Sequence, residues 1–297
     1  MAVPERVDGL IKWAARLLER ANLCYGHGTA NARDDAAAIV FHALRLRHDT
    51  APASYRLVVS AAGRRRAEAL LRRRIEERLP SAYLTGVTWF AGHEIRVTPD
   101  VLVPRSPIAE LCLKSFEPWI EAARVRRVLD IGTGSGCIAI AAAHALPGAR
   151  VDATDISPRA LALASSNVRR HRLGRRVRVL RSDVYGALRH RRYDVIVSNP
   201  PYVPAAGMRQ LPPEYDAEPR IGLQASHNGL GIIARILAGA CRHLEPHGIL
   251  VVEAGDTERE VRQRWPSLPF TWLEFEHGGR GVFLLNADQL WESSHVR

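Results

Sequence analysis

The sequence has few of the features that place a chain in a membrane or outside a reducing compartment. Its 297 residues contain no apolar run of about eighteen residues or more, so no transmembrane helix is expected. The start, MAVPERVDGLIKW, lacks an apolar core segment, which argues against a signal peptide. The four cysteines, at positions 24, 112, 137 and 241, form no CxxC pair. A disulfide framework is therefore not predicted, and a reducing cytoplasm fits this cysteine usage.

Several motifs of known chemistry are missing as well. The twelve histidines are scattered without HExxH or another paired metal spacing, and the cysteines offer no zinc motif, so no metal site is predicted. The chain also lacks the GxSxG nucleophile turn and the lysine of a P-loop. The sequence directs the search for function to other turns.

Positive charge is abundant, at a formal net value of +11. Such a balance favours an acidic partner, for example RNA or a ribosome. Lys12 and Lys114 are the only lysines, however, and every other basic residue is arginine in an alanine-rich chain. A composition bias of the whole genome explains that pairing equally well, so both interpretations stay open.

Helical patterns predict a small N-terminal domain over residues 1–80. In RVDGLIKWAARLLERANL, helical spacing puts one set of apolar residues on a single face: Leu10, Ile11, Ala14, Leu17 and Leu18. YGHGT breaks the pattern, and Asn31 can cap a second helix, ARDDAAAIVFHALRL. A third helix, AGRRRAEALLRRRIEERL, stops at Pro80. Its arginine clusters, 64–66 and 72–74, favour a solvated helix face, with an RNA contact as the alternative.

The pattern changes twice after residue 80. Residues 81–106 are rich in turn formers and predict a linker with a short hairpin. In residues 107–297, apolar strand segments such as RRVLDI and RYDVIVS alternate with helical segments. This alternation is typical of an α/β domain with a mostly parallel sheet covered by helices. Near the end, FTWLEFE and GVFLLN are joined by the turn HGGR, which predicts an antiparallel hairpin at the sheet edge.

A glycine-rich turn follows the first strand of this domain. In LDIGTGSGC the strand ends at Asp130, and Gly132, Gly134 and Gly136 then open a helix. Glycines let the backbone turn sharply and approach a ligand closely. The GxGxG spacing differs from the GxGxxG of dinucleotide enzymes, because Cys137 stands at the position after Gly136. Alone, such a turn also serves helix–strand packing.

Carboxylates end the next two strands. Asp155, in DATDISPRAL, can accept hydrogen bonds from two ribose hydroxyls, although it could instead only help to cap the helix that follows. Asp183, in LRSDVYG, could accept a bond from an adenine amino group while Val184 packs on the ring, or it could be a turn residue. Both lie at the carboxyl ends of predicted parallel strands, where such sheets bind ligands.

The fourth strand ends in VSNPPYVP, an abrupt stop because neither proline has an N–H to donate. The side chain of Asn199 and the carbonyl of Pro200 offer two acceptors, Pro201 stiffens the turn, and Tyr202 adds a flat ring. Two acceptors can hold both hydrogens of a planar –NH2 group while the ring stacks on its plane. The nitrogen lone pair then faces an electrophile nearby. The long segment VPAAGMRQLPPEYDAEPRIGLQASHN lacks periodicity and is expected to be a substrate-covering loop.

In this order, these motifs resemble class I S-adenosylmethionine-dependent methyltransferases. The further stretches YGHGT, LVPRSPIAEL, LPPEYDAEPRIGL and PFTWLEFEHGGRGVF look like the bacterial protein-glutamine methyltransferases that modify the third large-subunit ribosomal protein. The resemblance covers nearly the whole chain and implies the class I fold, a mostly parallel seven-stranded sheet, with a small N-terminal helical domain that recognises the ribosomal protein or an assembling particle. It implies S-adenosylmethionine as cofactor and methylation of a glutamine side-chain amide.

The resemblance also implies roles for individual residues. The cofactor-binding set is Asp130, Gly132, Thr133, Gly134, Gly136, Asp155, Ile156, Asp183, Val184 and Asn199. The catalytic set, which positions the glutamine, is Asn199, Pro200, Pro201 and Tyr202. Related alternatives are the same chemistry on peptide-chain release factors and methylation of a flipped adenine in DNA. A non-catalytic ribosome-assembly protein would not need an intact NPPY motif, and the GxGxG spacing opposes a dehydrogenase.

Overall fold

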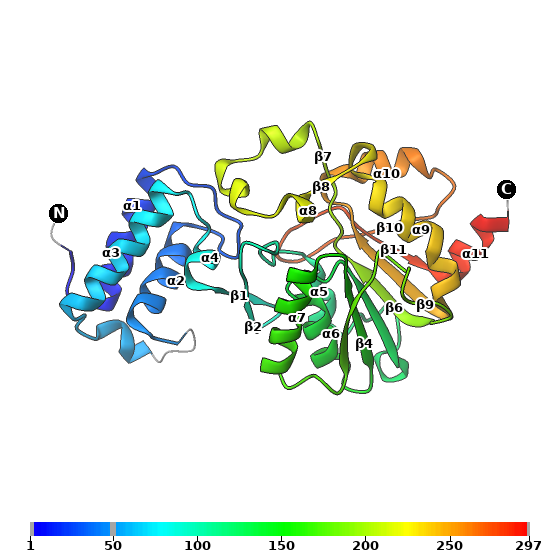
Figure 1. Cartoon of the computed structure of the whole chain (residues 1–297), viewed down its shortest axis with the longest axis horizontal. Helices are drawn as coiled ribbons and strands as arrows, with labels where there is room; N and C mark the ends of the chain where they lie inside the picture. Colours follow the sequence, from blue (N-terminus) through cyan, green and yellow to red (C-terminus); the bar gives the residue numbers. More distant parts are fainter. Residues whose placement is uncertain (1–2, 48–51, 296–297) are drawn as a thin grey trace. The chain divides into compact units, whose positions relative to one another are not determined.

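The computed structural model describes residues 3–47 and 52–295, so residues 1, 2 and 48–51 of the predicted N-terminal domain lie outside the described part. The described chain forms two compact units. A helical unit contains residues up to 88 together with 97–99 and 212–218. A sheet unit contains residues 89–96, 100–211 and 219 onward. Figure 1 follows the chain from the helical N-terminal elements to the last helix.

The helical unit contains the three predicted helices and one short one: α1 (Val7–Arg20), α2 (Ala32–Leu44), α3 (Ala61–Glu76) and α4 (Ser81–Thr85). Asn31 caps α2 as predicted, because its side chain accepts hydrogen bonds from the backbone N–H groups of Arg33 and Asp34. The apolar face of α1 packs into the core of this unit. Within that face Leu17 is half-buried, whereas the other four predicted residues are buried.

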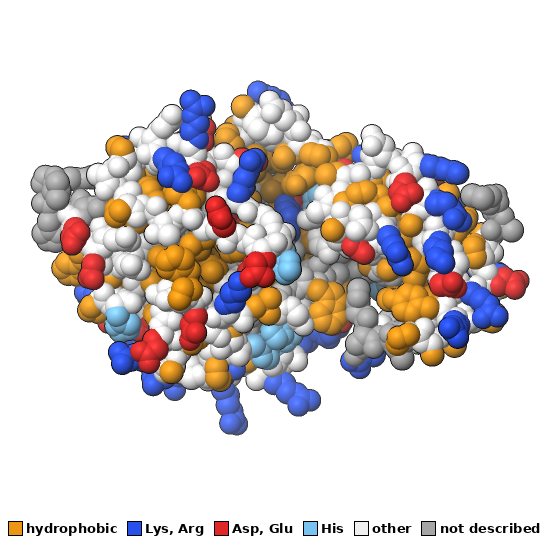
Figure 2. All heavy atoms as spheres, turned by 180° about the vertical axis from the view of Figure 1, so that it is seen from behind, with side chains coloured by type: hydrophobic (Ala, Val, Ile, Leu, Met, Phe, Trp, Pro, Cys, Tyr) orange, Lys and Arg blue, Asp and Glu red, His pale blue; other side chains and the backbone are white. Residues whose placement is uncertain are grey.

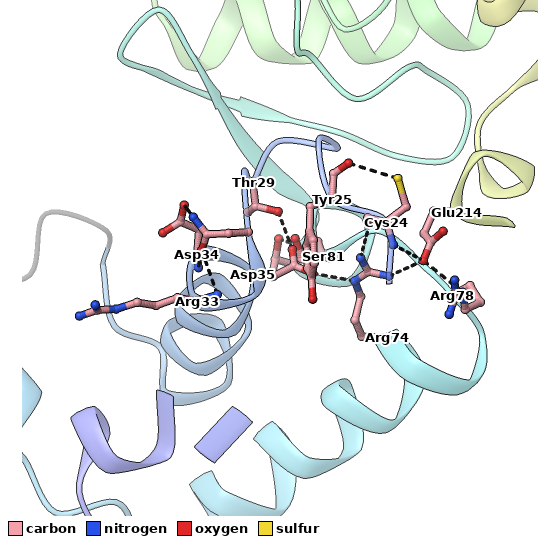
Figure 3. A network of polar contacts seen from close by, with 12 residues as sticks. Cys24, Tyr25, Thr29, Arg33, Asp34, Asp35, Arg74, Arg78, Ser81 and Glu214 are labelled. Atoms are coloured by element: carbon pink, nitrogen blue, oxygen red, sulfur yellow. Dashed lines mark hydrogen bonds and ion pairs between the residues drawn. The ribbon is translucent and has the colours of Figure 1, made fainter. Parts of the chain in front are cut away.

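A fully buried arginine connects the parts of the helical unit (Figure 3). Arg74, on α3, lies 2.7 Å from an Asp35 carboxylate oxygen and donates to the backbone carbonyl of Cys24 at 2.9 Å. It also lies 3.6 Å from the carboxylate of Glu214, which is fully buried. Glu214 in turn accepts from the Cys24 backbone N–H at 3.0 Å. Arg78 also pairs with Glu214, at 3.1 Å, so two arginines balance two buried carboxylates from distant positions in the sequence.

The segment Pro212–Glu218 was expected to lie in the domain 107–297, but it groups with the helical unit. Its buried anchor is Glu214, and Tyr215 packs edge-to-face on His27 with ring centroids 4.4 Å apart. The flanking chain forms short elements: β7 (Val203–Pro204), α8 (Arg220–Leu223) and β8 (Gln224–Ala225).

The sheet unit is built on seven strands in the order β10-β11-β9-β6-β3-β4-β5. Their bounds are β3 (Arg127–Ile131), β4 (Arg150–Asp155), β5 (Val177–Arg181), β6 (Tyr193–Ser198), β9 (Leu244–Glu253), β10 (Thr271–Leu273) and β11 (Val282–Asn286). The strands β9, β6, β3, β4 and β5 run parallel, while β11 pairs antiparallel with both β9 and β10. The predicted sheet and its antiparallel edge are confirmed.

Three helices connect parallel strands: α6 (Cys137–Ala145), α7 (Pro158–Arg170) and α9 (Gly231–His243). Outside these connections lie α5 (Ile108–Leu113) before β3, α10 (Glu258–Arg264) between β9 and β10, and α11 (Ala287–His295) after β11. The central strand β6 is buried along its whole length, which explains its continuous apolar sequence. The short strands β1 (Val87–Phe90) and β2 (His93–Arg96) form the predicted hairpin.

The part of the chain that the structure describes has no helix long and apolar enough to span a membrane. On the face shown in Figure 2, basic and acidic side chains are both scattered over the surface, and several basic ones project along the lower edge. In the helical unit, exposed Arg73 pairs with Glu77 one turn away, at 2.9 Å. Arg74 of the same predicted cluster is buried, so residues 72–74 are not a uniformly solvated face.

Replacing Arg74 tests the buried network. Arg74→Ala leaves Asp35 buried without its cation, whereas Glu214 keeps Arg78 at 3.1 Å, so the free energy of unfolding should fall by about 3–5 kcal/mol. Arg72→Ala, an exposed neighbour on the same helix, should change it by less than about 0.5 kcal/mol. Urea unfolding of both variants measures the difference, and equal small effects would show that the network does not hold this unit together.

Candidate active site

The glycine turn is built around Asp130, in β3. One Asp130 carboxylate oxygen accepts a hydrogen bond from the Thr133 hydroxyl at 2.6 Å and another from the Ala139 backbone N–H at 3.1 Å. It therefore joins the turn to the first turn of α6. The glycines adopt left-handed φ values, +73° at Gly132 and +54° at Gly134, and a Cβ at either position would point into open space. Here glycine is required by conformation and leaves room for a ligand.

Asp130 is completely buried, and burial raises the pKa of its carboxyl to about 7. Its hydrogen bonds with Thr133 and Ala139 oppose that rise, whereas the charge of Asp155 adds to it. The second carboxylate oxygen of Asp130 is buried without a hydrogen-bond partner among the described residues. Asp130 therefore holds the turn in place from the buried side, without lining the cavity.

Asp155 connects the glycine turn to the next helix. At the end of β4, its two carboxylate oxygens accept from the Gly134 N–H at 2.9 Å and from the Ser157 N–H at 2.8 Å. The helix-capping role weighed in the sequence is thus present in part, while the cap itself is Ser157, which accepts from the Ala160 N–H. Each carboxylate oxygen of Asp155 keeps a second lone pair, so Asp155 can still accept hydrogen bonds from ribose hydroxyls.

A cavity of about 390 Å³ lies at the carboxyl ends of these parallel strands. Most of the predicted site residues line it: Gly132, Thr133, Gly134, Asp155, Ile156, Asp183, Val184, Asn199, Pro200 and Pro201. Three do not line it, namely Asp130, Gly136 and Tyr202. At Gly136 a Cβ would press on Ala164 of α7 at 3.3 Å, so this glycine permits close helix packing at the turn.

Arg235 was not predicted, and it changes the environment of Asp183. Its guanidinium, on α9, lines the cavity and lies 2.8 Å from the Asp183 carboxylate. The hydrogen bond with Arg235 holds the pKa of Asp183 below its usual range. Asp183 is therefore ionised and oriented as an acceptor. No local sequence signal pointed to Arg235, because it lies on a helix far along the chain.

The register of two neighbouring strands places the NPPY turn beside the glycine turn. Ile131, the last residue of β3, pairs with Ser198, the last residue of β6. The Ser198 hydroxyl also donates to the Ile131 carbonyl at 2.8 Å. Asn199 and Gly132 follow directly, so the proposed amide-binding residues and the glycine turn share one cavity wall.

Tyr202 is held by residues that the sequence analysis missed. Its hydroxyl donates to the carboxylate of Glu253, at the end of β9, at 3.0 Å. The Tyr202 ring packs against Gly255, where a Cβ would collide with it. The Tyr202 carbonyl packs in the same way against Gly229, where a Cβ would also collide. The sequence did offer a signal for Glu253, because it is a carboxylate at the end of a predicted strand, as Asp155 and Asp183 are.

Glu253 also connects the NPPY turn to the segment before α5. The Ser106 hydroxyl donates to its other carboxylate oxygen at 2.5 Å. Burial raises the pKa of Glu253, while the bonds from Ser106 and Tyr202 lower it. Ser106 itself lines the cavity. Glu253 therefore acts through its neighbours, by fixing two parts of the wall.

The cavity residues fit S-adenosylmethionine. The open space at Gly132 and Gly134 permits close backbone approach, the carboxylates of Asp155 and Asp183 suit hydroxyl and amino donors, and the apolar side chain of Ile156 is 46% exposed. Cys137 lines the same cavity, but burial raises the pKa of its thiol to about 12, so it stays protonated near neutral pH.

Comparisons with known proteins agree with this geometry. The Methyltransferase small domain family matches residues 110–210. Over 95% of this chain, the identity is 43% to the ribosomal protein uL3 glutamine methyltransferase of Xanthomonas campestris and 45% to that of Xylella fastidiosa, covering 91% and 90% of those proteins. The protein of the same name from Bordetella pertussis is 42% identical, with 95% of each chain covered.

The chain belongs to the ribosomal protein uL3 glutamine methyltransferase family. This confirms the predicted methyltransferase fold, the enzyme class and S-adenosylmethionine as the cofactor. Among solved structures, the hMettl16 catalytic domain in complex with MAT2A 3'UTR hairpin 1 shares the fold, with a TM-score of 0.50 and 19% identity over 83% of this chain and 89% of that one. The roles of individual residues stay predictions.

The raised pKa of Asp130 predicts a pH dependence of stability. The unfolded carboxyl titrates near 3.8, and the folded one titrates near 7. A raised folded pKa stabilises the fold at low pH, and this contribution is lost as pH rises from about 4 to about 7, by on the order of 4 kcal/mol in total. Asp130→Asn should remove that part of the slope.

Thermal unfolding of the two proteins between pH 5 and pH 8 measures this effect. The wild-type melting temperature should fall more steeply with rising pH than that of Asp130→Asn. Parallel curves would show that Asp130 does not titrate in this window.

Proposed function

We propose that this chain transfers the methyl group of S-adenosylmethionine to the side-chain amide nitrogen of a glutamine in ribosomal protein uL3. The observation that carries the proposal is that Asn199 and Pro200 line the same cavity as Gly132, Gly134 and Asp155. The names of relatives at 42–45% identity support the choice of substrate.

An amide nitrogen is a poor nucleophile because its lone pair is delocalised into the carbonyl. Asn199, through its side-chain oxygen, and Pro200, through its backbone carbonyl, accept the two amide hydrogens and fix the plane of the amide. This orientation directs the nitrogen toward the methyl group and favours a pyramidal nitrogen. Glu253 and Gly255 hold Tyr202, and thereby the NPPY turn, in one conformation.

S-adenosylmethionine, when bound, supplies an electrophilic methyl group on a sulfonium. Gly132 and Gly134 would let the chain approach it, Asp155 would accept hydrogen bonds from the ribose hydroxyls, and Asp183 with Ile156 and Val184 would hold the adenine. The methylated amide loses its proton to water after transfer. Catalysis by this chain is therefore alignment of two groups in a cavity whose walls are already hydrogen-bonded in place.

The substrate is tested with methyl-labelled S-adenosylmethionine and three acceptors side by side: uL3, a peptide-chain release factor and duplex DNA. Mass spectrometry then locates the label. We expect a methylated glutamine on uL3 alone. Label on the release factor instead would show that glutamine methylation is correct but uL3 is not the substrate. Label on DNA alone would contradict protein methylation.

Asn199→Ala should separate chemistry from cofactor binding. The substitution removes one amide acceptor, so the turnover number should fall roughly 100-fold or more, while cofactor affinity changes little. Asp155→Ala should instead weaken cofactor binding, because it removes the acceptor for the ribose hydroxyls and the hydrogen bond from the Gly134 N–H. Calorimetry with S-adenosylhomocysteine and a single-turnover assay measure both variants. Full activity of Asn199→Ala would exclude the role given to this residue.

A further inference from the structure

Three histidines from separate segments of the sheet unit lie together. His93 begins β2, His144 is in the last turn of α6, and His171 directly follows α7. Each offers a ring nitrogen within 4.8 Å of the others. Their ring centroids are 4.3 Å (93–144), 5.5 Å (144–171) and 5.8 Å (93–171) apart. Their sequence spacing matches no metal motif, which is why the sequence predicted no metal site.

These separations bring the three rings within reach of a shared ion. The His93 and His144 rings are stacked with 21° between their planes, so the exposed His144 ring must rotate for both lone pairs to point at it. With bonds of about 2.0–2.1 Å from zinc to nitrogen, the centroids of neighbouring imidazoles around one ion lie roughly 4–6 Å apart. His93 and His171 are half-buried, and His144 is exposed. An ion held by all three would thus keep one coordination position open to solvent.

A hydrogen bond presets one of the three rings. Nε2 of His171 lies 2.9 Å from the backbone carbonyl of Glu94. Since a carbonyl can only accept, Nε2 is the donor, and in the neutral ring Nδ1 is the nitrogen left to bind a metal. A backbone carbonyl on the far nitrogen is the usual partner of a metal-binding histidine.

The charged groups nearby restrict the choice of ion. Glu94, next to His93, has its carboxylate paired with Arg170 at 2.9 Å. Arg176 lies close enough to lower the pKa of His144, but its guanidinium donates to the backbone carbonyl of Ala143. Neutral nitrogen donors without a free carboxylate suit zinc, nickel or copper and disfavour calcium and magnesium.

We propose that His93, His144 and His171 form a site for a divalent transition metal of the zinc class. Its role is structural, because none of the three histidines lines the methyltransferase cavity. The ion would tie the β1–β2 hairpin to the carboxyl-terminal ends of α6 and α7. The amino-terminal ends of these helices carry the glycine turn and the Asp155 loop.

A connection that already exists runs along the same path. The Asn167 side chain, on α7, exchanges hydrogen bonds with the backbone of Arg96 in β2, at 3.1 and 2.9 Å. It also donates to the Ser135 carbonyl in the glycine turn at 2.8 Å. A metal bound by the three histidines would reinforce this contact between α7 and β2, because His171 follows α7 and His93 begins β2.

The site is tested on the full chain without an affinity tag. Zinc titration by calorimetry should show one ion per chain, and cobalt should give the visible absorption of a nitrogen-coordinated ion. His144→Ala and His171→Ala should weaken binding at least about tenfold, because each removes one of three ligands. His190→Ala and His277→Ala, at exposed histidines of the same unit, should leave it unchanged.

Thermal unfolding and a charge variant complete the test. Zinc should raise the melting temperature of the wild type and not that of His144→Ala, an exposed position whose loss does not perturb the core. Arg176→Gln should tighten binding, because it removes the neighbouring cation. Equal zinc affinity in the wild type, His144→Ala and His171→Ala would overturn the proposal, as would the absence of any stoichiometric binding.

Discussion

The carboxylate of Asp130 is completely buried where β3 meets the glycine turn, and the cofactor half of the site depends on it. Its hydrogen bonds reach forward to Thr133 in the turn and to Ala139 in α6. They fix the turn in a conformation that only glycine adopts easily at positions 132 and 134. Burial raises the pKa of this carboxyl and is unfavourable to its charge, so the turn is preorganised at a cost in stability.

The second half of the site is joined to the first by strand pairing. Ile131 and Ser198 end neighbouring parallel strands in register, and the two turns that follow them meet at one cavity wall. The NPPY turn then needs its own support. Glu253, from the next strand, binds Tyr202 and Ser106, so three strand ends of the sheet cooperate in shaping one cavity.

Local patterns predicted the strands, the three long helices, the Asn31 cap and the turns at Gly132 and Asn199, because each depends on neighbouring residues or on the period of the chain. Side chains that act across long sequence distances gave no such signal. Glu214 joins the helical unit through Arg74, Arg235 pairs with Asp183, and the three histidines meet from three elements. Such pairings depend on tertiary packing between distant segments, which the periodicity of the sequence does not predict.

The central claim is that Asn199 and Pro200 hold a glutamine amide in the cavity that the Asp130-anchored turn shares. The most direct measurement is a crystal structure of this protein with S-adenosylhomocysteine and a glutamine-containing uL3 segment. We predict hydrogen bonds from the amide NH2 to the Asn199 side-chain oxygen and the Pro200 carbonyl, with the ribose on Asp155. A glutamine bound elsewhere, or an amide whose nitrogen points away from the cofactor sulfur, would contradict the account.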